Sequence, residues 1–261
     1  MLLGVNIDHI AVLREARKIN DPNPLDALGI CKVSGADQIT IHLREDRRHI
    51  HDRDAEQIIE QSALPINLEC SINKQIIDIV CKLKPTRVTL VPENREEVTT
   101  EGGLDCENNF KAIQKAVDTL HQHEIEVSLF IDPTKDMIDL SRMLEVEWIE
   151  LHTGSFANIY AMLYSNLAQT HNCIEELDLP RDELKKRFNE SIKKIKKTSK
   201  YAKKLGLKVA AGHGINYQNI EYITPLKHIE ELNIGQSIIA RSVFTGLGDA
   251  ISSMKELCEK K

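Results

Sequence analysis

The chain has 261 residues, a formal net charge of −6 and a sequence pI of ≈ 6.0. This length suits one α/β barrel with a large core, and the acidic balance argues against general nucleic-acid binding, which usually needs a basic surface. Six cysteines are scattered without a C-x-x-C pair, the N-terminus lacks a basic signal region, and no apolar run is long enough to span a bilayer. We therefore expect a cytoplasmic protein without a structural zinc site.

Short apolar strands alternate with helices along the whole chain. The predicted strands cover residues 2–7, 39–41, 65–68, 87–91, 126–131, 148–151, 207–210 and 229–233. The predicted helices lie near residues 26–33, 54–63, 74–83, 110–120, 137–144, 157–205 with a break near 179–180, 219–224, and 237–259 with glycine interruptions at 246 and 248. Residues 10–17 form a further helical turn or loop. Strict alternation favours a parallel sheet, and eight repeats favour a single-domain TIM (β/α)8 barrel with additional helices over an open doubly wound sheet. A dinucleotide-binding fold is less favoured because no G-x-G-x-x-G follows the first strand.

Every predicted strand presents a polar or ionisable group at or just after its C-terminal end. These groups are Asp8-His9, His42 with Arg44, Glu69, Glu93, Asp132, His152, His213 and Asn233. In a parallel barrel all strands point their C-terminal ends to the same face. A polar residue after one strand simply begins a loop, but the agreement across the strands predicts an active site at this rim.

Three of the rim groups are suited to proton transfer. His42 and His213 titrate near neutral pH, and Glu69 follows the apolar Leu68, so partial burial would raise its pKa. Two imidazoles and a carboxyl group fit a condensation with dehydration. Taken singly, each histidine is more often structural, and Glu69 could pair with an arginine. A zinc site built from rim histidines is less favoured, because the rim looks suited to anions.

Two anion sites are predicted on opposite sides of this rim. Gly212-His213-Gly214 and Gly235-Gln236 follow the last two strands, where barrels bind phosphate through backbone N–H groups. Arg17, Arg44 and His49 form a cationic cluster suited to phosphate oxygens. Two such sites around one acid–base centre indicate two phosphorylated reactants. The loop containing Gly102-Gly103 is either a lid that excludes water or a surface excursion.

Several sequence runs resemble the pyridoxine 5′-phosphate synthase family. They are GVNIDHI (4–10), HLREDRRHI (42–50), NLE (67–69), LVPE (90–93), EVTTEGGLD (97–105), GHG (212–214) and ELNIG (231–235). The resemblance covers nearly the whole chain in order, and the runs at 42–50 and 97–105 are the most specific. It implies a TIM barrel assembled as a homo-octamer. It also implies condensation of 3-amino-2-oxopropyl phosphate with 1-deoxy-D-xylulose 5-phosphate in de novo vitamin B6 biosynthesis, with no cofactor or metal.

The resemblance also implies roles for single residues. It makes His42 and Glu69 bases and His213 the proton donor. The residues that it implies as contacts of the aminoketone phosphate are Asn6, Arg17, Gly214, Gly235 and Gln236. The residues that it implies as contacts of the deoxyxylulose phosphate are Asp8, His9, Arg44, His49 and Thr99.

The chain departs from the family pattern in three places. The family commonly has histidine where Gln236 stands, so we expect a backbone contact there, and Ala210 replaces a usual asparagine. The segment around 157–190 is longer than expected, and its position after the sixth strand indicates a surface or subunit-contact insertion.

Two other functions stay open on the residues alone. One is a different phosphosugar barrel enzyme, although a Schiff-base aldolase should carry a lysine at a strand end and none of the eight does. The other is binding of nucleic acid or an anionic membrane by the lysine-rich stretch 185–208. Its apolar stripe of Leu184, Phe188, Ile192 and Ile195 predicts instead that this helix packs on the protein.

Overall fold

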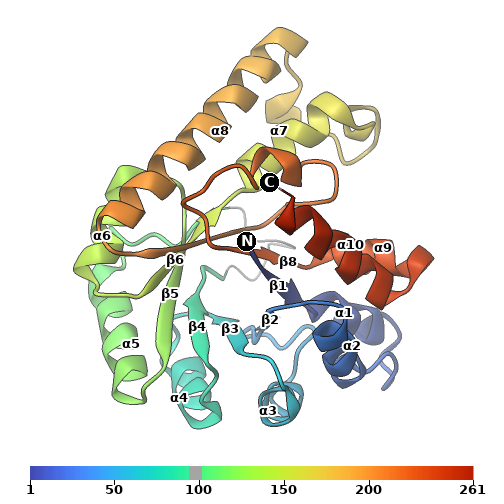
Figure 1. The fold of residues 1–261 in the computed structure, drawn as a ribbon. Coiled ribbons are helices and arrows are strands. Elements are labelled where there is room, and N and C mark those ends of the chain that lie inside the picture. Colours follow the sequence, from blue (N-terminus) through green and yellow to red (C-terminus); the bar gives the residue numbers. More distant parts are fainter. Residues whose placement is uncertain (94–101, 261) are drawn as a thin grey trace.

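The computed structural model describes residues 1–93 and 102–260, and its eight strands close into a parallel barrel (Figure 1). The strands are β1 (Leu2–Asn6), β2 (Gln38–His42), β3 (Ile66–Cys70), β4 (Arg87–Leu90), β5 (Glu126–Ile131), β6 (Trp148–His152), β7 (Lys208–Gly212) and β8 (Glu231–Ile234). Each strand pairs in parallel with the next, and β8 returns to β1 with Leu232 opposite Leu3. The predicted TIM (β/α)8 barrel is confirmed.

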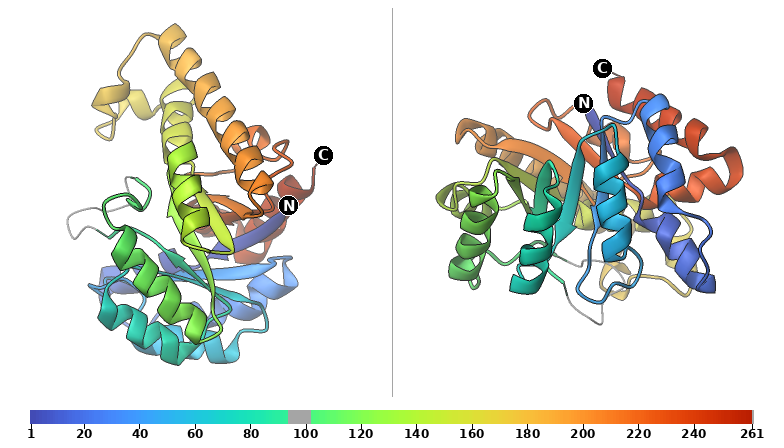
Figure 2. Two further views of the ribbon diagram at one scale, coloured as in Figure 1. Left: turned by 90° about the vertical axis from the view of Figure 1, so that its left-hand side faces the viewer. Right: turned by 90° about the horizontal axis from the view of Figure 1, so that it is seen from below.

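Ten α-helices in the described part of the chain surround the barrel (Figure 2). They are α1 (Asp8–Arg17), α2 (Ala27–Val33), α3 (Asp52–Gln61), α4 (Lys74–Leu83), α5 (Phe110–Gln122), α6 (Lys135–Met143), α7 (Gly154–Tyr164), α8 (Arg181–Lys204), α9 (Gln236–Thr245) and α10 (Leu247–Glu259). Local signals explain several of their ends. The side chain of Asn73 accepts a hydrogen bond from the Gln75 N–H at the start of α4, and Thr134 caps α6 in the same way.

The long helical region predicted for residues 157–205 is two helices, α7 and α8. The predicted break is confirmed but is wider than expected, because the chain leaves the helix at Ser165 and resumes only after Pro180. The 165–180 segment holds two 3-10 turns, Leu167–Gln169 and Glu175–Leu177. The predicted helix at 219–224 is a single 3-10 turn, Ile220–Tyr222. The closing helix divides at Gly246 into α9 and α10, as its glycines predict.

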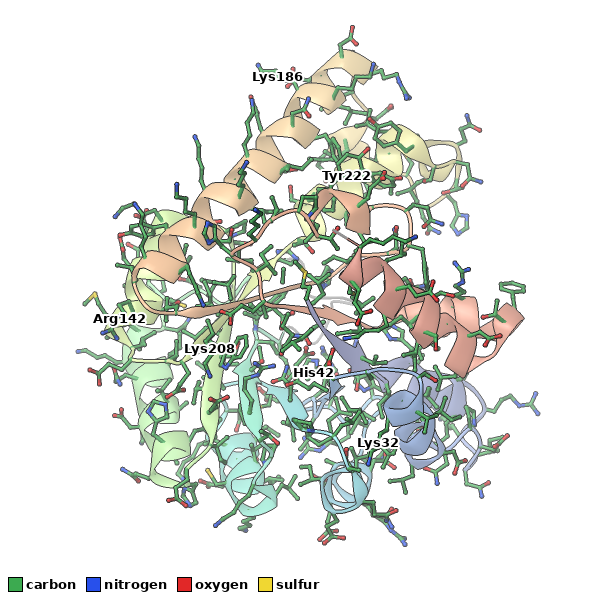
Figure 3. All side chains as sticks on the ribbon, in the orientation of Figure 1. Lys32, His42, Arg142, Lys186, Lys208 and Tyr222 are labelled. Atoms are coloured by element: carbon green, nitrogen blue, oxygen red, sulfur yellow. The ribbon has the colours of Figure 1, made fainter. Side chains whose placement is uncertain are left out.

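Helix α8 packs through its apolar stripe, and part of it extends beyond the barrel. Leu184, Phe188 and Ile195 are buried, and the Phe188 ring stacks on Phe156 of α7 with the centroids 5.4 Å apart. Figure 3 shows Lys186 towards the far end of α8, away from His42 near the middle of the barrel. The predicted packing of this helix on the protein is therefore confirmed. Within the described residues, no helix is both long and apolar enough to cross a membrane.

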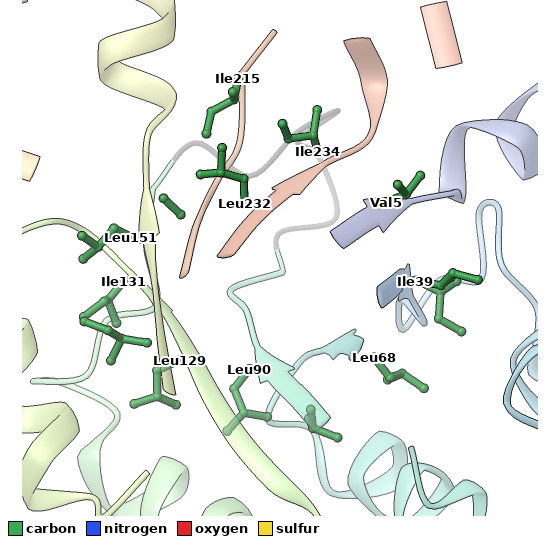
Figure 4. Close-up of a cluster of buried hydrophobic side chains, with 14 of the residues drawn as sticks. Val5, Ile39, Leu68, Leu90, Leu129, Ile131, Leu151, Ile215, Leu232 and Ile234 are labelled. Carbon is green, nitrogen blue, oxygen red and sulfur yellow. The ribbon is translucent and has the colours of Figure 1, made fainter. Parts of the chain in front are cut away.

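The strands were predicted to be apolar, but they carry most of their apolar side chains on one face. Fully buried side chains such as Val5, Ile39, Leu68 and Leu90 recur on successive strands and form the hydrophobic core (Figure 4). Many of the alternate positions are polar and are also buried; they include Gln38, Thr40, Asn67, Arg87, Glu150, Glu231 and Asn233. Side chains alternate between the two faces of a strand, so the polar set lies inside the barrel.

An ion pair across the barrel interior confirms this orientation. Arg87 on β4 donates to Glu231 on β8, from nearly opposite sides of the barrel, and both side chains are 4% exposed. The same guanidinium donates to Gln38 Oε1 at 2.7 Å and stacks over the Trp148 ring at 4.2 Å. The barrel interior beneath the C-terminal rim is thus charged and hydrogen-bonded rather than apolar.

Candidate active site

A cavity of ≈ 320 Å³ opens at the C-terminal ends of the strands. Seven of the predicted site residues line it: Asn6, His9, Glu69, His213, Gly214, Gly235 and Gln236. They come from the ends of β1, β3, β7 and β8, so residues more than 200 positions apart share one wall. The barrel closure brings these ends together, as the parallel topology predicts.

His42 and Glu69 stand side by side because β2 and β3 pair in that register. The Nδ1 atom of His42 lies 3.9 Å from Glu69 Oε2, which is beyond hydrogen-bond range. The Nε2 atom of His42 instead meets Glu93 Oε1 at 2.9 Å. Glu93 ends the stretch after β4 and is a neighbour of His42 that the sequence roles did not include.

Two carboxyl groups face the cavity with raised pKa values. Burial raises the pKa of Glu69 well above its ordinary value, and the charges of Glu150 and Asp8 add to the effect. Burial likewise raises the pKa of Glu150 to about 7, although a hydrogen bond from Asn233 Nδ2 at 2.6 Å opposes this. A carboxyl group with a raised pKa, such as Glu150 with its value of about 7, is usable as a general acid or base.

Glu150 is a site residue that the sequence roles missed. It lies in the middle of β6, in the run Trp-Ile-Glu-Leu-His, and is 3% exposed. The signal was present, because a carboxylate inside an apolar strand needs a partner or a function. Its space is made by Gly212, where a Cβ atom would lie 2.1 Å from Glu150 Oε1.

His213 is held in an unusual backbone conformation directly after β7. Its φ angle is 76°, in the left-handed region that few side chains other than glycine adopt. The Thr153 hydroxyl donates to the carbonyls of Gly212 and His213 at 2.6 and 2.7 Å, and the His152 ring lies 4.9 Å away in an edge-on arrangement. Burial lowers the pKa of His213 to about 4, and His152 contributes. A bound phosphate would oppose this shift, because an adjacent anion favours the imidazolium.

The end of β1 is tied to the end of β2 by Asp8. Its carboxylate accepts the His42 backbone N–H at 2.9 Å and the Asn6 Nδ2–H at 2.8 Å. His9 lines the cavity, and burial lowers its pKa, with Asp8 opposing. Its buried Nδ1 has no hydrogen-bond partner among residues 1–93 and 102–260.

The predicted glycine-rich anion site is built from backbone. Helix α9 begins at Gln236 with Gly235 as its N-cap, so its first N–H groups lack partners within the helix. Gly214 adopts φ of 84°, and it faces the same cavity as Gly235 and Gln236. A helix N-terminus with free N–H groups suits phosphate oxygens.

The cationic cluster is only partly assembled. Arg44 and His49 are both buried, and burial lowers the pKa of His49, with Arg44 among the nearby charges. Arg17 lies in the last turn of α1 and is exposed. One turn earlier, Arg14 binds Asp54 through two nitrogens and donates to the His49 carbonyl at 2.8 Å. Arg14 therefore holds the loop that carries His49, a role that spacing alone could not reveal.

Two predictions lie partly or wholly outside the described residues. Thr99 falls in the 94–101 segment, and so does most of the loop that we considered as a lid. Gly103 is described, and its N–H donates to Asp132 Oδ1 at 3.3 Å.

The fold and the site together define a class of protein: a TIM-barrel enzyme with titratable side chains and a glycine-capped helix N-terminus at its C-terminal rim. The chain belongs to the family described as pyridoxal phosphate biosynthesis protein PdxJ, whose family model matches residues 3–260. The family resemblance expected from the sequence is thereby confirmed.

Curated relatives match over almost their entire length. The chain is 76% identical over 257 residues to the pyridoxine 5′-phosphate synthase of Aliarcobacter butzleri (strain RM4018), covering 98% of each chain. It is 65% identical over 257 residues to that of Sulfurovum sp. (strain NBC37-1), covering 98% of this chain and 100% of the relative. A solved phosphoribosyl anthranilate isomerase from Thermococcus kodakaraensis aligns with a TM-score of 0.60 and 11% identity, covering 100% and 99% of the two chains. That last likeness concerns the fold alone.

Proposed function

We propose that the chain is a pyridoxine 5′-phosphate synthase. It condenses 3-amino-2-oxopropyl phosphate with 1-deoxy-D-xylulose 5-phosphate to form pyridoxine 5′-phosphate, inorganic phosphate and water. The observation that carries the proposal is the convergence of His42, Glu69 and His213 on one rim, beside backbone suited to phosphate. Family membership and the high identity to named synthases support the same activity.

Different rim residues carry out different proton transfers of the proposed reaction. The substrate amine condenses with the sugar ketone, and His42 and Glu69 then remove and return protons during dehydration and ring closure. Glu150 faces the same cavity and adds a carboxyl group with a pKa of about 7. His213 protonates the departing phosphate after the bound anion has raised its pKa. The reaction as proposed needs no cofactor or metal.

Substrate contacts follow the two sides of the rim. The aminoketone phosphate binds at the glycine-rich side through Asn6, Gly214, Gly235 and the Gln236 backbone, with Arg17 as its charged contact. The contacts of the deoxyxylulose phosphate are Asp8, His9, Arg44, His49 and Thr99. The cavity supports the assignment of the aminoketone phosphate site, because four of the five residues assigned to that site line the cavity. Arg17 is the fifth residue of the set.

The direct test measures product from the two purified substrates by the absorbance of the new pyridine ring. Glu69→Gln and His42→Asn should each lower turnover by about 10²–10⁴-fold, the usual contribution of a general acid or base. Near-normal turnover in both variants would show that the acid–base assignment is wrong.

The proposed assembly is a cytoplasmic homo-octamer. Large apolar side chains are exposed on α1, α2 and α9, and they include Leu13 at 49%, Val33 at 84%, Val243 at 67% and Phe244 at 89%. Apolar side chains this exposed suit burial in a subunit interface. All six cysteines are free thiols, and five of them are buried, which suits a reducing compartment. The 157–190 insertion adds surface after β6 and supplies subunit contacts rather than chemistry.

A further inference from the structure

One nitrogen of the His42 imidazole is hydrogen-bonded to a buried carboxylate. His42 Nε2 lies 2.9 Å from Glu93 Oε1, and the Glu93 side chain is 4% exposed. The other oxygen of Glu93 accepts the backbone N–H of Glu45 at 2.9 Å. Both oxygens of Glu93 therefore act as acceptors, one towards a ring and one towards a peptide group.

The charge state of Glu93 decides which nitrogen of His42 carries the hydrogen. Burial alone would raise the pKa of Glu93, but the hydrogen bonds from His42 and the Glu45 N–H outweigh it, and the pKa lies below its ordinary value. An ionised carboxylate only accepts hydrogen bonds. The Nε2 atom of His42 must then be the donor, so in the neutral form of the ring the lone pair lies on Nδ1.

The other groups around His42 leave this assignment unchanged. Glu69 Oε2 stands 3.9 Å from Nδ1, too far for a hydrogen bond but close enough to flank the same reacting group. Asp8 binds the His42 backbone N–H rather than the ring, and the His49 ring lies edge-on with its centroid 6.2 Å away. The charge of Arg44 adds a smaller contribution to the lowered pKa of Glu93, after the contributions of His42 and the Glu45 N–H. Within residues 1–93 and 102–260, Glu93 is the group that bonds Nε2.

We propose that Glu93 is the positioning residue for His42: its carboxylate holds the Nε2–H tautomer and leaves Nδ1 as the atom that takes the substrate proton. Nδ1 is the nitrogen on the Glu69 side, so the two bases act on one reacting centre. The inference rests on the proposed role of His42 as a base. It adds a fixed direction of proton transfer that the family roles of His42 and Glu69 do not contain.

Substitution of Glu93 by glutamine removes the negative charge of the side chain but keeps its size and shape. An amide has one acceptor oxygen, whereas Glu93 uses two. If the amide oxygen keeps the Glu45 N–H, its NH₂ group points at His42 Nε2, and the ring must place its hydrogen on Nδ1. That tautomer has no lone pair on the side of Glu69. If instead the oxygen keeps His42, two donors face each other at Glu45.

The experiment uses the full-length protein labelled with ¹⁵N-histidine. Nitrogen NMR shifts distinguish the two neutral tautomers, and we expect Nε2–H for His42 in the wild type and Nδ1–H in Glu93→Gln. Glu93→Gln should lower kcat by about 10²–10⁴-fold, as expected for loss of a general base, while KM changes by less than about threefold. Glu45→Gln is the matched control, because its side chain bonds Ser71 and Asn73 rather than His42. It should keep both the tautomer and kcat.

The readouts separate failure of this inference from failure of the proposed function. A wild-type His42 with its hydrogen on Nδ1 would overturn the inference whatever the activity, and so would a Glu93→Gln enzyme with unchanged kcat. A wild-type protein that forms no pyridine product would refute the synthase function instead, and the NMR result would still decide the tautomer. If Glu93→Gln fails to fold, the wild-type spectrum alone remains decisive.

Discussion

Gly214 offers a test of how tightly the glycine-rich anion site is built. Its φ is 84°, and a Cβ atom there would lie 2.5 Å from the Ala157 Cβ in α7, while the next atoms are 4.0 Å away. Alanine at position 214 thus meets two penalties. The left-handed backbone costs about 1–2 kcal/mol, and the overlap costs about 1–3 kcal/mol. We expect Gly214→Ala to lower the free energy of unfolding by about 2–5 kcal/mol.

The overlap has a single neighbour, so a second substitution can remove it. Ala157→Gly deletes the contacted Cβ and costs about 1 kcal/mol as a helical glycine. The double variant should therefore be more stable than the sum of the single effects by about 1–3 kcal/mol. Only the backbone strain of position 214 and the helical glycine would remain.

Urea unfolding of the four proteins measures this coupling, and the KM for 3-amino-2-oxopropyl phosphate reports on the site. Gly214→Ala should raise KM, because the displaced backbone no longer aims its N–H at the phosphate, and the double variant should recover part of the loss. Effects that add to within about 0.5 kcal/mol, together with an unchanged KM, would refute the close-packing argument.

Three further predictions concern the barrel interior and the surface. Arg87→Met leaves Glu231 buried and unpaired, so it should cost about 3–5 kcal/mol in urea unfolding, whereas Arg87→Met with Glu231→Leu should recover most of this; equal losses in both would contradict the pairing. Glu150 has a folded pKa of about 7 against an ordinary 4.5, so the folded state holds its proton longer and the wild type loses stability as pH rises between these values. The Glu150→Gln variant should lack that decline in a series of Tm measurements, and an identical pH profile would count against the raised pKa. Phe244→Glu places a charge on a side chain that is 89% exposed, and it should give a smaller particle by light scattering with unchanged circular dichroism; an unchanged mass would exclude this face as an interface.

Element order could be predicted because its signals are local. The apolar runs mark all eight strands, and the helix predicted at 74–83 agrees with the observed bounds of α4, whose first turn is capped by Asn73. Boundaries failed where the signal was weak, as in the 165–180 segment, where two 3-10 turns separate α7 from α8. Turns of three residues leave little periodicity to detect.

The polar interior of the barrel was not predicted, for a physical reason. Arg87 and Glu231 are 144 positions apart, and nothing in the sequence around either residue indicates the other as its partner. Only closure of the barrel places the two side chains face to face in the buried interior. An unpaired charge there would be destabilising.

The amino-acid sequence by itself determined that eight strands would point polar ends at one rim, and it marked His42, Glu69 and His213 there. The tertiary structure decided what those groups can do. It buried Glu69 beside Glu150, partly buried His213, and set Glu93, 51 positions away, against the ring of His42. Protonation and tautomer depend on burial and on partners across space, and a linear order of residues contains neither.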